Sequence, residues 1–192
     1  MTADPISTLK SDPAIYPLIE EHGDLTLEPA EDTFERLVRS IISQQVSTAS
    51  ARAIRERVFD RFEITPEAIV AVDRESLRDA GLSSQKAEYV QNVAEAYIEK
   101  GYDHAYFEGL TDDEVVSELT TIRGVGEWTG RMFLMFCLAR EDVFPVEDLG
   151  IRKGMWALFY EDMTRSEMRE RAEPWRPYRS YASLYLWRAV DG

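Results

Sequence analysis

The sequence IRGVGEWTG at residues 122–130 places two glycines on either side of a single valine. Glycine adopts positive φ angles without strain, so Gly124 and Gly126 suit a tight turn between two helices. The first N–H groups of a following helix have no intrahelical partner, and the helix dipole gives them partial positive charge. This stretch therefore predicts either a plain turn between helices or a hairpin whose amides bind one phosphate group.

About twenty residues farther along, an acidic residue precedes another predicted helix. Asp148 follows the apolar and extended stretch 143–146 and comes directly before LGIRK at 149–153. An aspartate in this position is most often an N-cap. Taken by themselves, these residues leave open whether Asp148 is a helix cap or a functional acid.

Helical periodicity dominates the chain, and Ser, Thr or Asp recurs just before the apolar-periodic segments. This pattern predicts an all-α protein. The expected helices are 33–45, 47–61, a short helix from 66, another that ends at 81, 84–100, 112–122, 127–138, one that begins near 148, and a last one after 177.

Composition limits the class of protein. With 192 residues, 44% of them hydrophobic, the chain can bury one sizeable core or two small ones. It shows neither a membrane-spanning run nor a signal peptide at its start, so we expect a cytoplasmic protein with no membrane partner. The single cysteine, Cys137, stands among apolar residues and is expected in the core, because one thiol can form neither an internal disulfide nor an iron–sulfur cluster.

The formal net charge of -14 argues at first against a nucleic-acid partner. Only four of the 22 basic residues are lysines, however, and such an acidic, arginine-retaining surface resembles proteins from salt-loving organisms. The charge is also uneven: residues 1–35 hold nine acids and one base, whereas residues 36–61 hold six arginines and two acids. The chain is thus locally basic where a partner could dock, although solvated helix faces would show the same pattern.

A third stretch, WRPYRSYASLYLWR at 175–188, is similar to the C-terminal helix of the 3-methyladenine DNA glycosylase II group of the helix-hairpin-helix (HhH-GPD) superfamily. The stretches 39–47 and 81–89 match the same group in the same order, and the resemblance runs from about residue 34 to 188. It implies a two-lobed helical fold without the extra N-terminal sheet domain of larger members. One lobe would be 33–140 and contain the hairpin, and the other would join 1–32 to 141–192, with the base pocket between them.

The resemblance also implies roles for individual residues. Asp148 falls on the catalytic acid, and Gln45 on the wedge that fills the place of the extruded base. Other positions would line the base pocket, namely Trp128, Trp187, Met132 and Tyr181. A further set would contact DNA phosphates, namely Gly124, Gly126, Thr129, Arg123 and Lys153. Three backbone carbonyls fall on a site that holds a monovalent cation in relatives, namely those of Thr120, Ile122 and Val125. Trp128 and Trp187 could instead be core aromatics, and Gln45 a helix-end cap.

The implied activity is the hydrolytic release of alkylated purines, of the 3-methyladenine and 7-methylguanine type, from double-stranded DNA in base excision repair. Relatives that also nick the strand use a lysine at the position of Trp128, so a monofunctional enzyme is expected, associated with the nucleoid. It would require no cofactor, although a structural sodium or potassium ion could bind at the hairpin, and no obligate protein partner is evident. The alternatives are a glycosylase for other damaged bases, which would show that lysine or a four-cysteine cluster, and a non-catalytic helix-hairpin-helix DNA-binding module. Arg123 replaces the usual hairpin proline and Gly130 the usual alanine, which puts the rigidity of the hairpin in doubt.

Overall fold

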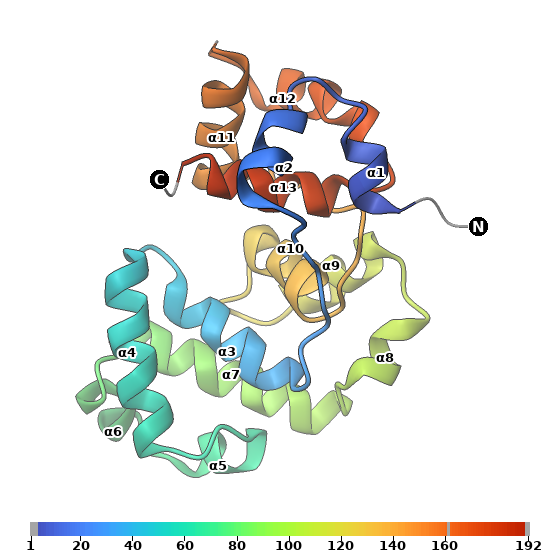
Figure 1. Cartoon of the computed structure of the whole chain (residues 1–192). Helices are drawn as coiled ribbons and strands as arrows, with labels where there is room; N and C mark the ends of the chain where they lie inside the picture. The colour runs from blue at the N-terminus through green and yellow to red at the C-terminus, as the bar shows by residue number, and fades with distance from the viewer. Residues whose placement is uncertain (1–3, 161, 191–192) are drawn as a thin grey trace. The chain divides into compact units, whose positions relative to one another are not determined.

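The computed structural model describes residues 4–160 and 162–190, and all regular structure within them is helical (Figure 1). The elements are α1 (Pro5–Leu9), α2 (Tyr16–His22), α3 (Thr33–Ser43), α4 (Thr48–Arg61), α5 (Pro66–Ala71), α6 (Arg74–Asp79), α7 (Ser84–Lys100), α8 (His104–Glu108), α9 (Asp112–Thr120), α10 (Glu127–Phe136), α11 (Leu149–Phe159), α12 (Arg165–Arg171), the 3-10 helix η1 (Glu173–Trp175) and α13 (Arg179–Arg188). No β-strand occurs in these ranges, so the predicted all-α fold is confirmed for them. None of their helices is long and apolar enough to cross a membrane.

The chain divides into two compact units. Unit 2 is the continuous segment Ala30–Leu138 and contains α3 to α10. Unit 1 joins residues 1–29 to 139–192 and contains α1, α2, α11, α12, η1 and α13; residues 1–3, 161 and 191–192 lie outside the described part of the chain. The hairpin therefore belongs to unit 2, and Asp148 and the C-terminal helix to unit 1. A base pocket between two lobes stays a prediction.

Short polar side chains begin four helices of unit 2 where the sequence predicts them, namely Asp32, Ser47, Ser83 and Thr111. Thr111 forms a capping box with Glu114: its hydroxyl accepts the Glu114 N–H at 3.3 Å, and the Glu114 carboxylate accepts the Thr111 N–H at 2.8 Å. Each cap satisfies amides that have no partner inside the helix. The first residue of each of these helices can therefore be predicted from a few neighbouring residues.

Three predicted helix ends lie too far along the chain. α3 ends at Ser43 because Gln45 has a φ of 56°, which is incompatible with a right-handed helix. α10 ends at Phe136 instead of residue 138, and Ala139 has a φ of 51°. α9 ends at Thr120, two residues before the predicted end. In the first two cases a left-handed residue terminates the helix without the glycine that usually marks such a site.

The core of unit 2 forms around α7, which packs against α3, α5 and α6, while α10 packs against α3 and α9. α3 contributes four aliphatic side chains that are fully buried, namely Leu37, Val38, Ile41 and Ile42. Burial of each such side chain stabilises the fold by about 1.5–3 kcal/mol. Cys137 lies in this unit and is 1% exposed, as expected for a core residue.

In unit 1, α11 packs closely against α13. A Cβ built on Gly154 of α11 would lie 2.5 Å from the Leu186 carbonyl oxygen of α13, so only glycine allows this approach. Trp175 and Tyr185 are the largest side chains buried in the same core. Gly154 therefore allows α11 to pack closely against α13, and the buried aromatic side chains fill the core beside this contact.

Four short helices were not predicted: α1, α2, α8 and α12. All four have seven residues or fewer, and α1, α2 and α8 lack a sustained apolar period. The fourth, α12, begins with a capping box between Thr164 and Glu167. Its sequence signature, Thr-Arg-Ser-Glu at 164–167, was available and would have located this helix.

Candidate functional site

The hairpin between α9 and α10 is so closely packed that it requires glycine. Gly124 has a φ of 108°, a conformation that side chains rarely adopt. A Cβ built on Gly124 would come within 2.2 Å of the Tyr89 ring on α7. Both the backbone angle and the space around it therefore exclude a larger residue at position 124.

Two amide side chains from other helices hold the hairpin in place. The Gln44 Nε2 group donates to the Gly124 carbonyl and to Thr129 Oγ1, each at 3.0 Å. The Asn92 Nδ2 group donates to the Arg123 carbonyl at 3.0 Å. Thr129 is only 1% exposed, so its hydroxyl supports the hairpin from inside the protein. This burial disfavours direct contact between the hydroxyl and a phosphate. These bonds restrain the hairpin backbone, as a proline at position 123 would otherwise do.

The start of α10 offers backbone donors. Gly126 is the exposed N-cap of α10 and has no side chain to cap the helix. Within residues 4–160 and 162–190, no protein acceptor bonds the N–H of Gly124 or of Gly126. Arg123 pairs with Glu88 at 2.6 Å, but its side chain is 72% exposed, and such a surface pair is weak enough to exchange for a phosphate. The hairpin can therefore bind an anion through its amides and the dipole of α10.

The carbonyls predicted to hold a monovalent cation belong to Thr120, Ile122 and Val125. The Ile122 carbonyl accepts the Val125 N–H at 3.0 Å, which occupies one of its two lone pairs. In the part of the chain that the structure describes, no group of three or more His, Cys, Asp or Glu side chains could hold a metal ion. A cation at the hairpin would thus depend on backbone oxygens, which are suitable ligands for sodium or potassium.

Gln45, the predicted wedge, lies between α3 and α4 in the left-handed conformation described above. Its side chain is exposed, and it borders a cavity of about 350 Å³ in unit 2. Tyr89 and Lys86 also line this cavity, and the Lys86 ammonium donates to the Ile42 carbonyl at 2.6 Å. Burial lowers the pKa of Lys86 from its ordinary value. Gln45 is thus adjacent in sequence to Gln44, the residue that contacts the hairpin, and is presented on the surface of the same unit.

Asp148 is the N-cap of α11, and its Oδ1 atom accepts two hydrogen bonds. The donors are the Ile151 N–H at 3.0 Å and the Trp187 indole N–H at 2.8 Å. A Cβ built on Gly150 would lie 2.7 Å from the Trp187 ring and 3.0 Å from Asp148 Oδ1. Asp148 is therefore a helix cap and, in addition, a carboxylate oriented by an indole that only glycine at position 150 admits.

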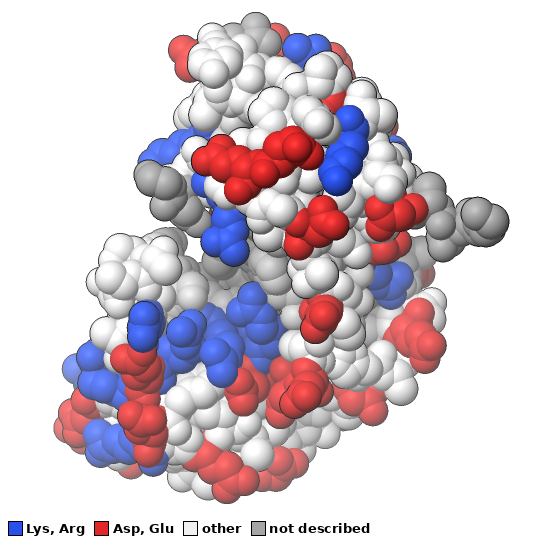
Figure 2. Space-filling view, in the orientation of Figure 1, with Lys and Arg blue, Asp and Glu red and all other residues white. Residues whose placement is uncertain are grey.

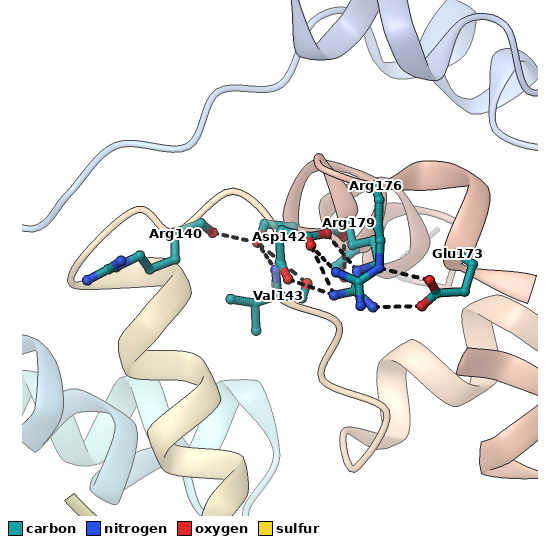
Figure 3. A network of polar contacts seen from close by, with 8 residues as sticks. Arg140, Asp142, Val143, Glu173, Arg176 and Arg179 are labelled. Carbon is teal, nitrogen blue, oxygen red and sulfur yellow. Dashed lines mark hydrogen bonds and ion pairs between the residues drawn. The ribbon is translucent and has the colours of Figure 1, made fainter. Parts of the chain in front are cut away.

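A network of ion pairs fixes the segment before Asp148 to the start of α13 (Figure 3). The Arg179 guanidinium donates to Asp142 through Nε at 2.6 Å and through Nη2 at 3.1 Å, and the Arg176 Nη1 group donates to the same carboxylate at 2.6 Å. Both arginines also contact Glu173. The buried Ser180 hydroxyl donates to the Arg140 carbonyl at 2.6 Å and accepts the Val143 N–H at 2.9 Å. The chain that leads to Asp148 is thereby tied to α13.

Trp187 also lines a cavity of about 370 Å³ in unit 1, together with Leu25, Thr26, Leu184 and Arg188. Tyr181 lies six residues before Trp187 on α13 and is half-buried. Its hydroxyl donates to the Glu141 carboxylate at 3.4 Å. Burial, with the Glu141 carboxylate, raises the pKa of Tyr181. Aromatic and polar groups therefore gather on the same helix that orients Asp148.

The remaining predicted residues fall on both units. Lys153 is exposed on α11, about one turn beyond Asp148. Trp128 is half-buried in the first turn of α10, and Met132 is 6% exposed on the same helix. Unit 1 thus carries the acid, Trp187, Tyr181 and Lys153, and unit 2 carries the hairpin, Gln45, Trp128 and Met132.

Five residues that support the site were not predicted from the sequence, namely Gln44, Asn92, Gly150, Asp142 and Arg179. Gln44 is next to the predicted wedge in a Gln-Gln pair, and Gly150 is two residues from the predicted acid, so both were within motifs already singled out. Asn92 carried no comparable signal, because it lies in the middle of a long helix. Their contacts join segments that are far apart in the chain.

Comparison with known proteins gives a consistent result. The family model described as HhH-GPD superfamily base excision DNA repair protein matches residues 38–177. The putative DNA-3-methyladenine glycosylase YfjP of Bacillus subtilis is 31% identical over 185 residues, which cover 91% of this chain and 64% of the relative. DNA-3-methyladenine glycosylase 1 of Schizosaccharomyces pombe is 34% identical over 171 residues, which cover 82% of this chain and 72% of the relative. The solved 3-methyladenine DNA glycosylase Mag1 of fission yeast, in complex with abasic DNA, aligns with a TM-score of 0.89 at 30% identity over 97% of this chain and 96% of that one.

Proposed function

Because this chain belongs to the HhH-GPD superfamily of base excision DNA repair proteins, we propose that it is a DNA-3-methyladenine glycosylase that removes alkylated purines from double-stranded DNA. The observation that carries the proposal is the Asp148 carboxylate, held at the start of α11 by the N–H groups of Ile151 and Trp187. The relatives that are named 3-methyladenine glycosylases supply the substrate class. In a non-catalytic DNA-binding module the helix cap would need only the bond from the Ile151 N–H, so the second donor, the Trp187 indole, favours an enzyme.

The first step is extrusion of the damaged nucleotide, since the sugar bond of a stacked base cannot be approached. In the proposal, Gln45 fills the place that the base leaves. The amides of Gly124 and Gly126 hold one backbone phosphate, and Arg123 and Lys153 add positive charge beside the strand. None of these contacts depends on the identity of the base, so they bind DNA without selecting a sequence.

Selection depends on the base pocket, for which we retain Trp128, Trp187, Met132 and Tyr181. A purine alkylated at N3 or N7 is cationic, and an indole face attracts such a ring by about 0.5–2 kcal/mol. The indole N–H of Trp187 is already engaged with Asp148, so a base would meet the face of this ring and not its donor edge. Trp187 would thereby act on the base and on the acid at once.

In the chemical step, the bond between the base and C1′ breaks and its electron pair leaves with the base, which becomes neutral. The sugar gains oxocarbenium character, and the Asp148 carboxylate stabilises that positive charge. Water then adds to C1′, and the carboxylate orients it and accepts its proton. Because Trp128 occupies the position of the lysine in strand-nicking relatives, no Schiff base forms and the product is an intact strand with an abasic site.

The proposed reaction uses no cofactor. A sodium or potassium ion on the carbonyls of Thr120, Ile122 and Val125 would add positive charge next to the bound phosphate. The Ile122 carbonyl would use its second lone pair for this purpose, as its bond to the Val125 N–H occupies the first. Such an ion would strengthen DNA binding, while the protein groups at Asp148 carry out the chemistry.

The test is release of free base from a duplex that contains 7-methylguanine or 3-methyladenine, at low and at high salt. We expect base release by the parent protein and strand breaks only after alkali. Asp148→Asn should lower the single-turnover rate at least about 100-fold, in line with the loss of a preorganised charge. Asp73→Asn is the matched control, since Asp73 is also an aspartate N-cap, on α6 of the other unit. Absence of base release by the parent protein would refute the proposed enzymatic activity. Equal rates for Asp148→Asn and Asp73→Asn would refute the role of Asp148. Strand breaks without alkali would refute the monofunctional reaction.

A further inference from the structure

Unit 2 carries a row of arginines on α3 and α4 that the proposed reaction does not use. We call Arg36, Arg39, Arg52 and Arg55 the arginine stripe. Figure 2 shows basic side chains gathered over α3 and α4 on this face of unit 2. Burial, with the nearby charges of Arg39 and Arg55, lowers the pKa of Arg36, and Arg52 and Arg55 both act on Glu56. The four guanidinium groups therefore lie close enough to influence one another or a shared neighbour.

Aromatic rings hold two members of the stripe. The Arg36 guanidinium lies 4.8 Å from the centre of the Phe136 ring, and the Arg39 guanidinium lies 4.7 Å from that of Phe59. Stacking on a ring restricts the side chain but leaves the planar donor fork available to an anion. These arginines are therefore arranged before any partner binds.

The stripe is only partly neutralised. Arg39 pairs with Glu35 at 2.6 Å and Arg52 pairs with Glu56 at 2.8 Å, and both pairs are partly or largely exposed and hence weak. Over residues 4–160 and 162–190, no ion pair joins Arg36 or Arg55 to an acid. Four positive groups thus face two negative ones, in a chain whose formal net charge is -14. Concentrating like charge in this way is unfavourable unless an anion binds there.

The position of the stripe identifies the anion. α3 runs directly into Gln44, whose side chain bonds the hairpin. Arg39 and Arg36 precede Gln44 by five and eight residues, which is about 8 Å and 12 Å along a helix axis. Phosphates on one DNA strand advance by about 3.4 Å each along the duplex, so the stripe is within a few nucleotides of the hairpin. We propose that the arginine stripe binds the phosphodiester backbone of DNA that flanks the lesion, an inference that rests on DNA as the partner in the proposed function.

The test measures how binding of a short undamaged duplex depends on salt, by fluorescence anisotropy. Each phosphate contact contributes about 0.9 to the magnitude of the slope of log K against log salt. The double variant Arg36→Gln with Arg55→Gln should therefore lower that magnitude by up to about 1.8. Arg171→Gln is the matched control, because Arg171 stacks on Phe159 at 4.4 Å in unit 1, outside the stripe, and its slope should equal that of the parent.

A slope unchanged in the double variant overturns the proposal. The lysine double variant, R36K with R55K, should keep the slope, whereas a loss equal to that of the glutamine variant would show that packing and not charge is responsible. If the double variant does not fold, Arg55→Gln alone carries the test, with an expected change of about 0.9. Because the duplex is undamaged, failure of base release and failure of the stripe are observed separately.

Discussion

Replacing Trp187 with phenylalanine separates two roles of one side chain. Trp187→Phe retains an aromatic face for the base and removes the N–H that donates to Asp148 Oδ1 at 2.8 Å, which leaves the Ile151 N–H at 3.0 Å. A hydrogen bond to a charged group contributes about 1.5–3 kcal/mol. If that bond holds the carboxylate in its reactive position, the single-turnover rate should fall roughly 10- to 100-fold, at about 1.4 kcal/mol for each factor of ten.

The assay is base release from a 7-methylguanine duplex with enzyme in excess, at several enzyme concentrations. It yields a limiting rate and a half-saturation concentration for each variant. We expect the limiting rate to fall in Trp187→Phe, while the half-saturation concentration changes by a few-fold at most. Trp156→Phe is the control, since Trp156 also lies on unit 1 and donates its indole N–H, to the Met163 carbonyl at 3.3 Å, away from the acid.

An unchanged limiting rate in Trp187→Phe would refute the reasoning, because the carboxylate would then need no indole donor. A rise confined to the half-saturation concentration would assign Trp187 to the base pocket alone. A thermal unfolding curve for each variant distinguishes both results from partial unfolding. Loss of activity in Trp156→Phe as well would show that α11 is sensitive to any change in its packing.

Three further predictions concern positions other than Asp148 and Trp187. Gly150→Ala places a Cβ 2.7 Å from the Trp187 ring, so we expect a loss of about 1–3 kcal/mol in the free energy of unfolding, measured by denaturant titration, together with a lower limiting rate. Gln44→Ala removes the donor to the Gly124 carbonyl, and the hairpin should bind undamaged duplex about 2- to 10-fold more weakly in an anisotropy assay, since one hydrogen bond contributes about 0.5–1.5 kcal/mol. Cys137 is 1% exposed and burial raises the pKa of its thiol, so it should resist a disulfide reagent in the native protein and react once guanidinium unfolds it; rapid native reaction would contradict its place in the core.

Much of the fold follows from local chemistry in the sequence. The helix starts at Asp32, Ser47, Ser83 and Thr111 were predicted because a cap and its helix are neighbours in the chain. The hairpin was predicted for the same reason, since positive φ is a property of glycine itself. Where a left-handed residue is not glycine, as at positions 45 and 139, the sequence contains no such signal and the predicted helices ran too long.

The support of the candidate site could not be predicted in this way. The Gln44 amide meets the Gly124 carbonyl across 80 residues, and the Trp187 indole meets Asp148 across 39. Such contacts depend on how helices pack, and no periodicity within one helix encodes them. The resemblance to a family predicted Trp187 as a wall of the pocket, and its hydrogen bond to the acid became visible only in the folded chain.

The position of Asp148 depends on the length of the segment that carries it as well as on its hydrogen bonds. This segment is bonded to α13 at two points, at Asp142 through Arg179 and at Asp148 through Trp187. Six extended residues would span about 20 Å, whereas the eight residues of α13 between the two bonds span about 12 Å. Two tight turns within residues 144–148 take up the difference, closed by N–H to carbonyl bonds of 3.0 Å and 2.9 Å. One residue more or fewer in this segment would displace the carboxylate by about 3.3 Å, which exceeds the tolerance of a hydrogen bond. The ion pairs at Asp142 and the indole of Trp187 can therefore hold the Asp148 carboxylate in place only at this segment length.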